Sequence, residues 1–269
     1  MKTSILRTLL ALLPLLGSPF ARAHFPILIH DAGLGSTSGV VTITYATGHP
    51  FELEMEPAPR PDRLQCFDAR GRATNLTTNI EATLFRGDPN GAAWQVQIEP
   101  ARGDRLLALD SAPSVDADQK TVYREYVKVC LHRGLQGGWK QRTGQPLEIV
   151  PQTRPYGLRP GMTFSGRLLR GEAPVADTEI YFERLNERRP DAGSLPPEAL
   201  ITFVVRTNRD GEFTVSLPDA GWWVIGAYAD DLGPVRHAGQ DYRLEGFAGL
   251  WIRVEEPPHL PAATSATGP

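Results

Sequence analysis

Short runs in which apolar and polar residues alternate fill most of this chain, and they constrain its fold more than any other feature. Examples are "GVVTITYA", "AWQVQI" and "EFTVSLP". Such runs recur roughly every 8 to 15 residues with glycine and proline between them, which is the spacing typical of β-sandwiches. Almost no window has the 3.6-residue period of an amphipathic helix. The sequence therefore predicts an all-β protein.

The first 23 residues have the pattern of a cleaved secretory signal peptide. Lys2 and Arg7 accompany the apolar run "LLALLPLLG", and the triplet Ala21-Arg22-Ala23 forms a small-x-small cleavage pattern. No second run of about 18 apolar residues follows, so we expect no membrane span in the mature chain. We expect a periplasmic or secreted protein that begins at His24.

The mature chain is long enough for two domains. The best boundary is "PQTRPYGLRPG" at 151–161, where prolines and glycines interrupt the alternating pattern just after a strand. We expect one sandwich over 24–150 and a second over 151–256. The segment 257–269 is rich in Pro, Ala, Thr and Ser and predicts a disordered tail.

Charge and cysteine content restrict the partners and the chemistry. Removing the three basic residues of 1–23 leaves 25 Lys and Arg against 31 Asp and Glu, a net charge of −6, which argues against a nucleic-acid partner. An exported chain with two cysteines predicts a disulfide between Cys66 and Cys130. The alternatives are that one of them binds a soft metal or that both stay reduced.

Histidine is the residue type that points to chemistry here. The chain lacks the Gly-x-Ser-x-Gly, HExxH, phosphate-loop and dinucleotide motifs, so we do not expect a common enzyme. Cleavage before His24 would free an α-amine, which can chelate one metal ion together with the imidazole Nδ1 of the same residue. An amine with a pKa near 8 deprotonates readily for a metal. Nitrogen donors of this kind suit Ni(II), Co(II), Cu(II) and Zn(II).

Strand geometry selects the residues that can join His24. His30 is about 20 Å away if "HFPILIH" is one strand, so the two cannot share a metal. Pairing Asp31 with Val40 in an antiparallel hairpin sets residue 24 opposite residue 47, which brings His49 and Glu52 close to it. We therefore expect a metal site made of His24, His49 and Glu52.

Several longer segments resemble a known family. They are "AHF", "TYATGHPFELEMEPAPRPDRL", "LEIVPQTRPYGLRPGMTFSGRLLRGEAPVADTEIYF", "TNRDGEFTVSLPDAGWWVIGAY" and "GLWIRVE". The chain resembles exported bacterial domains of unknown function that are grouped with the substrate-specific components of nickel uptake. The resemblance implies two consecutive immunoglobulin-like or prealbumin-like β-sandwiches and periplasmic handling of a transition metal, Ni(II) or Co(II) before Cu(II) or Zn(II). It also implies a metal transporter component of the inner or outer membrane as the partner.

The same resemblance assigns residues and reveals departures. The family's N-terminal histidine maps onto His24, and its Gly-His-Pro-aromatic-Glu motif maps onto His49 and Glu52. The family often carries another histidine after the Glu, where this chain reads "LEME". Cys66 and Cys130 are not features of the family.

Two other functions compete with metal delivery. A metal-free adhesion or scaffold module would make His24 an accident of processing, His49 a loop residue and Glu52 one of several solvated acids. A copper oxidative enzyme of the lytic polysaccharide monooxygenase type would use the same N-terminal histidine brace. The metal content of the processed protein distinguishes the metal-free module from a metal-delivery protein. Peroxide-dependent cleavage of a polysaccharide distinguishes the copper enzyme from a metal-delivery protein.

Overall fold

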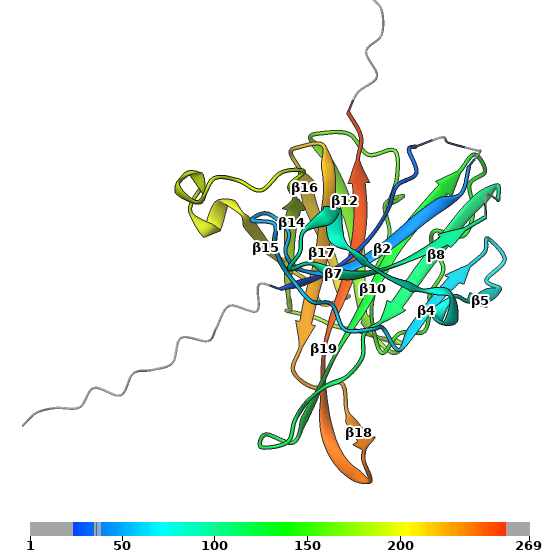
Figure 1. The fold of residues 1–269 in the computed structure, drawn as a ribbon. Coiled ribbons are helices and arrows are strands. Elements are labelled where there is room, and N and C mark those ends of the chain that lie inside the picture. The colour runs from blue at the N-terminus through cyan, green and yellow to red at the C-terminus, as the bar shows by residue number, and fades with distance from the viewer. Residues whose placement is uncertain (1–23, 35, 37–38, 100, 257–269) are drawn as a thin grey trace, which may run out of the picture.

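The computed structural model describes residues 24–34, 36, 39–99 and 101–256, and they form an all-β protein with no α-helix (Figure 1). The signal peptide predicted over 1–23 and the tail predicted over 257–269 lie outside these residues. These residues also form four short 3-10 helices, at Thr77–Asn79, Phe85–Gly87, Ala192–Ser194 and Glu198–Leu200. No helix of the described residues is long and apolar enough to cross a membrane.

One sheet comes from the first part of the chain alone. Its strand order is β1-β2-β7-β6, with β3 paired to the outer part of β2. The strands are β1 Phe25–His30, β2 Val41–His49, β3 Glu54–Glu56, β6 Glu81–Leu84 and β7 Ala92–Ile98. All of its strand pairs are antiparallel. β1–β2, β2–β3 and β6–β7 follow one another in the chain, whereas β2 and β7 pair across the segment that holds β3 to β6.

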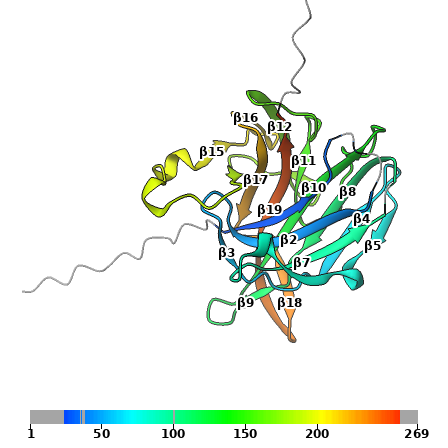
Figure 2. The same ribbon diagram turned by 45° about the horizontal axis from the view of Figure 1, so that its top comes forward.

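The largest sheet combines strands from both halves of the chain, in the order β15-β14-β17-β19-β10-β8-β4-β5 with β9 and β18 at its sides (Figures 1 and 2). Its first-half strands are β4 Arg63–Phe67, β5 Ala73–Asn75, β8 Gly103–Asp110, β9 Ser114–Asp116 and β10 Thr121–Arg133. Its second-half strands are β14 Glu179–Leu185, β15 Thr202–Arg206, β17 Gly221–Ala229, β18 Pro234–His237 and β19 Gln240–Val254. The two groups meet where β10 and β19 pair in parallel.

A third sheet has the order β11-β12-β13, with β16 on the other side of β12. Its strands are β11 Leu147–Pro151, β12 Met162–Arg170, β13 Ala173–Pro174 and β16 Glu212–Leu217. β11 precedes the boundary expected at 151 and β12 follows it, so "PQTRPYGLRPG" connects two strands that are paired with each other.

The large sheet carries a core on each of its faces. Along β19, Phe247 and Trp251 belong to the core under the first sheet, whereas Ala248, Leu250 and Ile252 belong to the core under the third. Successive side chains of a strand point to opposite faces. The first and third sheets therefore pack on opposite faces of one shared sheet, and the two β-sandwiches expected from the sequence have this sheet in common.

The disulfide predicted between Cys66 and Cys130 does not form in this fold. Both are free, buried thiols. Cys66 pairs with Leu107 and Cys130 with Leu106, so strand β8 lies between them. Strands two apart are separated by about 9.6 Å, which exceeds the Cα separation of about 7 Å that a disulfide tolerates. The two thiols also belong to different clusters, on opposite faces of the sheet.

Candidate functional site

His24 and His49 lie side by side at the open end of the β1–β2 hairpin. The strands pair Phe25 with Gly48, which sets residue 24 opposite residue 49. The centroids of the two imidazole rings are 4.4 Å apart, and the ring planes are inclined at 57°. The structure thus brings together the two histidines that the hairpin argument had selected.

The register of this hairpin differs by two residues from the one expected. We predicted Asp31 opposite Val40, but Asp31 lies opposite Thr42. The Asp31 amide donates to the Thr42 carbonyl at 3.2 Å, and the Thr42 amide donates to Asp31 Oδ1 at 2.9 Å. These bonds close the hairpin further along β2. A shift of two residues leaves every side chain on its own face, and here it moves His24 from Thr47 to His49.

Glu56 is the carboxylate that contacts the histidine pair. Strand β3 folds back on β2 and pairs His49 with Glu54 and Thr47 with Glu56. One carboxylate oxygen of Glu56 lies 3.0 Å from His24 Nε2, and the two side chains are 47% and 56% exposed. The site is therefore open to solvent, and an ion pair there contributes little to stability.

The tight β2–β3 connection depends on a glycine. Gly48 has φ 151°, and a Cβ at this position would lie 2.4 Å from the Glu54 carbonyl oxygen and 2.9 Å from the Met55 Cα. Only a residue without a side chain lets the two strands approach this closely. The "TGHP" segment thus positions both His49 and the glutamates that follow it.

Glu52, the third predicted ligand, does not contact either histidine. Among the described residues, no hydrogen bond or ion pair joins it to His24 or His49. It lies in the turn before β3, and its charge raises the pKa of His49. The alternation in "ELEME" places 52, 54 and 56 on one side, so the sequence held the signal for Glu56. The pairing of β3 with β2 decides which glutamate reaches His24.

Electrostatics favour a neutral imidazole at His49. Burial has the largest effect and lowers the pKa of His49, and the neighbouring His24 lowers it further. The charges of Glu52, Glu54 and Glu56 raise the pKa and oppose this shift. The net direction is downward, which favours the form of histidine that binds metals.

The second half of the chain holds the 50–53 turn in place. The Phe51 amide donates to Glu183 Oε1 at 3.0 Å, and the Asn186 side-chain amide donates to the Phe51 carbonyl at 2.6 Å. Arg189 donates to the Leu53 carbonyl at 2.6 Å. Burial raises the pKa of Glu183 to about 7. The start of the irregular 186–199 segment thus supports the site, a role that the local sequence does not reveal.

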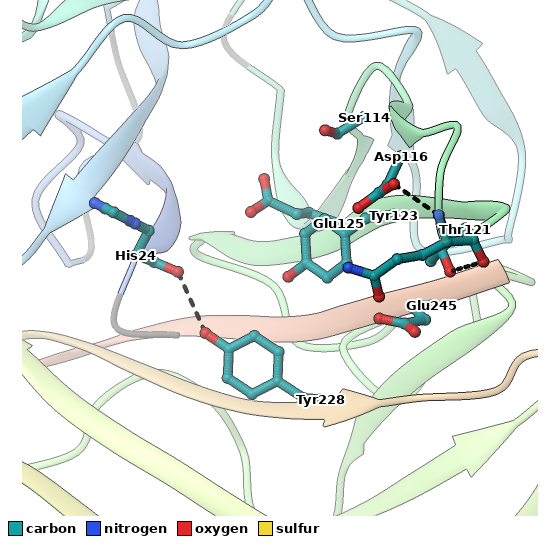
Figure 3. Close-up of a pocket in the computed structure, with 9 residues that line it drawn as sticks. His24, Ser114, Asp116, Thr121, Tyr123, Glu125, Tyr228 and Glu245 are labelled. Carbon is teal, nitrogen blue, oxygen red and sulfur yellow. Dashed lines mark hydrogen bonds between the residues drawn. The ribbon is translucent and has the colours of Figure 1, made fainter. Parts of the chain in front are cut away.

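A polar cavity of about 320 Å³ adjoins His24 on its other side (Figure 3). The imidazole of His24 points away from the cavity, while its carbonyl accepts a bond from the Tyr228 hydroxyl at 3.4 Å. The cavity is lined by Ser114, Asp116, Gln119, Thr121, Tyr123, Glu125, Tyr228 and Glu245. Burial raises the pKa of Glu125 to about 7. His24, the first residue after the predicted cleavage point, thus lies beside a group of carboxylates.

The other described histidines lie away from the His24–His49 pair. His30 stands at the far end of β1 against Trp222, with ring centroids 4.9 Å apart. His132 Nδ1 lies 2.7 Å from Asp104 Oδ1, and its ring stacks on Tyr156 at 4.1 Å. His237 lies in β18. His259 falls outside the described residues. As expected from strand length, His30 does not share a site with His24.

The arrangement offers two imidazoles and one carboxylate to a ligand. Within the described residues, no three or more His, Cys, Asp or Glu side chains are grouped so that they could hold a metal ion. In the uncleaved chain the backbone nitrogen of His24 belongs to a peptide bond, so it does not offer a metal the lone pair of a free amine. Side chains alone therefore do not complete a metal site here.

Comparison with known proteins gives a family and little more. A family model described as "Domain of unknown function (DUF4198)" matches residues 21–231. No curated protein matches the chain. The D0–D1 domain of intimin is 10% identical over 82% of this chain and 93% of that one, with a TM-score of 0.22.

Two further solved structures are similarly distant. Dimeric latent PorU from Porphyromonas gingivalis is 11% identical over 86% of this chain and 20% of that one, with a TM-score of 0.23. The Y1175G mutant of Salmonella alpha-2-macroglobulin is 14% identical over 84% of this chain and 13% of that one, also at 0.23. These TM-scores are too low to support an argument about function.

Proposed function

The chain belongs to the DUF4198 family of domains of unknown function, and we propose that its processed form binds a transition-metal ion at the His24–His49 pair. The observation that carries this proposal is the 4.4 Å separation of the two rings at the predicted cleavage point. The proposal adds one donor that is not a side chain, the α-amine that cleavage after Ala23 would free.

His24 and His49 supply the nitrogen donors. The α-amine and Nδ1 of His24 belong to one residue and can chelate one ion, and the His49 imidazole lies against that residue. The lowered pKa of His49 reduces the competition from protons. Three nitrogen donors suit Ni(II), Co(II), Cu(II) and Zn(II), which take imidazole readily.

Glu56 sets the tautomer of His24 in this proposal. Its carboxylate contacts Nε2 at 3.0 Å, so in the neutral ring Nε2 carries the proton and donates it to Glu56. Nδ1 then holds the free lone pair, on the nitrogen that can chelate together with the amine. Carboxylates that orient a ligating imidazole in this way raise its basicity and metal affinity.

We further propose that the ion is a cargo and that the protein acts in the periplasm without catalysing a reaction. The preference for Ni(II) or Co(II), and delivery to a transporter component of the inner or outer membrane, rest on the family resemblance alone. The net charge of −6 expected for the mature chain agrees with a cationic cargo.

The test uses protein exported with its own signal peptide, checked by intact mass to begin at His24 and then titrated with Ni(II), Co(II), Cu(II) and Zn(II). We expect one tight equivalent of metal. A version that begins Met-His24 keeps both imidazoles but loses the chelating amine, and its affinity should fall by about 100-fold or more, at least as much as loss of an outer-shell partner costs.

His30→Ala is the matched control, because it removes a histidine from the other end of the same strand and should leave the affinity unchanged. Equal binding by the His24 and Met-His24 forms would contradict the proposal. No binding of any of the four metals would favour the metal-free scaffold.

A further inference from the structure

A second cavity, of about 650 Å³, lies at the opposite end of β1 from the histidine pair. It is formed by the end of β1, the segment after β14, and the adjoining ends of β17 and β19, so both halves of the chain contribute. Its volume is within the range of small-molecule sites. β1 is six residues long, which places this cavity about 20 Å from His24. It is independent of the proposed metal site.

An aromatic and cationic surface forms one wall of this cavity. The indole of Trp222 contacts the His30 ring edge-on, with centroids 4.9 Å apart. The Arg253 guanidinium lies 6.0 Å from the centroid of the Trp222 ring. These three side chains form a continuous surface that combines a flat apolar face with a positive charge.

The Arg184 side chain lies next to this surface and packs against the backbone of Gly221. A Cβ added at Gly221 would meet Arg184 Nε at 3.1 Å, and Gly221 has φ 124°. The absence of a side chain at residue 221 therefore gives the guanidinium its place over the start of β17. Three guanidinium groups border the same cavity. Arg184 and Arg253 belong to this wall, whereas Arg86 is exposed and donates to the Asn186 carbonyl.

One polar atom of the lining, Arg184 Nε, is buried and lacks a hydrogen-bond partner among the described residues. Buried polar groups in native proteins are almost always bonded to protein, water or a ligand. The guanidinium of Arg184 is therefore the group of this cavity whose hydrogen bonds a polar molecule would complete.

The acidic side chains of the cavity lie at its rim. Asp31, Glu187 and Glu256 are exposed, whereas His30, Arg184 and Arg253 are at least partly buried. Glu255 lies 3.6 Å from Arg253 and neutralises part of its charge. Arg184 carries the less compensated positive charge inside. The exposed part of the lining holds the carboxylates of Asp31, Glu187 and Glu256 and one guanidinium, that of Arg86, which interacts with Glu187. A ligand that matches this layout carries a carboxylate at one end and an ammonium group at the other.

We propose that this cavity binds a zwitterion of the size of an amino acid or a dipeptide, with its carboxylate against Arg184 and Arg253 and its ammonium group toward Asp31, Glu187 and Glu256. Guanidinium groups are the strongest protein partners of carboxylates because they can donate two parallel bonds. The part of the Trp222 indole that stays exposed, 9% of the residue, offers contact to an apolar or aromatic side chain of the ligand.

The experiment is calorimetric titration of the full processed protein with each of the twenty free L-amino acids and with glycyl-L-phenylalanine. Phenylalanine amide lacks the carboxylate and 3-phenylpropionate lacks the ammonium group, so these two compounds test each end of the ligand. We expect at least one zwitterion to bind and both analogues to bind at least about tenfold more weakly than it. Binding by free amino acids or only by the dipeptide would show which size fits.

A variant of a lining residue, compared with two control variants, tests whether the zwitterion binds in this cavity. Arg184→Gln should weaken binding by about tenfold or more, while thermal unfolding shows that the variant remains folded. Arg236→Gln, on the exposed β18 hairpin, is the matched control and should bind like wild type. His24→Ala should also bind like wild type, which separates this result from the metal site. Failure of all the zwitterions to bind, or equal binding by phenylalanine amide or by Arg184→Gln, would overturn the proposal.

Discussion

The two histidines at the ends of β1 show how the position of a side chain along one strand changes what it can do. His24 is 47% exposed, contacts His49 and Glu56, and adjoins a polar cavity. His30 packs on Trp222, and burial lowers its pKa to about 4. The exposed ring is open to ligands from solution, whereas the buried ring stays neutral at neutral pH. One end of the strand carries the proposed metal site, and the other packs on Trp222 and lines a second cavity.

The largest effect should come from removing the packing partner of the buried histidine. Trp222 is 9% exposed and belongs to the core under the first sheet. Trp222→Ala should lower the free energy of unfolding by about 3–5 kcal/mol, because it removes buried aromatic surface and leaves a cavity. Urea unfolding measures this change.

Val204→Ala is the control for that variant, because Val204 is 48% exposed and its loss should cost no more than about 0.5 kcal/mol. If the two ends of β1 are independent, Trp222→Ala should leave metal affinity unchanged while the protein stays folded. A fall in metal affinity would show that they are coupled.

The second-largest effect should be a pH dependence of the free energy of unfolding that the buried His30 causes. The pKa of His30 falls from 6.5 to about 4, chiefly through burial, with a further lowering by Arg253 that Asp31 and backbone carbonyls oppose. Well above pH 6.5 this residue is unprotonated in both the folded and the unfolded state. As the pH falls toward 4, only the unfolded state takes up the proton, so the folded state loses stability. The loss should reach roughly 3 kcal/mol at pH 4.

Comparison with His30→Gln isolates this effect, because Glu125 and Glu183 titrate in both proteins. The free energy of unfolding of the wild type, relative to that of the variant, should fall between pH 6.5 and pH 4 and stay constant above that range. Parallel pH curves for the two proteins would mean that His30 is protonated in the folded state.

The smallest of these effects concerns the end of β1 at His24, where substitutions of Glu56 and Glu52 can be compared directly. Glu56→Gln removes the charge in contact with His24 Nε2 and should weaken metal binding by about 10- to 100-fold. Glu52→Gln removes a charge that acts on His49 only at a distance and should weaken it less. Metal titration of both processed variants tests the order, and a larger loss for Glu52→Gln would restore the ligand set predicted from the sequence.

Local sequence patterns were sufficient to predict the fold class and the histidine pair. Alternation in "VVTITYAT" and the turn residues before it indicate a hairpin whose open end holds residues 24 and 49. Adjacent residues of a strand face opposite sides, and Trp222 and Trp223 accordingly lie in the two different cores.

Contacts between distant segments account for what the sequence did not predict. The Asp31 carboxylate bonds to the Thr42 amide and shifts the hairpin by two residues. The pairing of β3 with β2 brings Glu56, rather than Glu52, to His24. Glu183 and Asn186, more than 130 residues further along, anchor the turn that carries the site. None of these bonds leaves a periodic signal in its own segment.

The sequence by itself determined that this chain forms strands, where most of them turn, and that a histidine follows the predicted cleavage point, because alternation and turn chemistry are properties of neighbouring residues. Only the tertiary structure decided that β10 and β19 join the two sandwiches through one sheet, that β8 separates Cys66 from Cys130, and which glutamate contacts His24. These outcomes depend on the pairing of strands far apart in the chain, and many such pairings satisfy the same local pattern of buried and exposed residues.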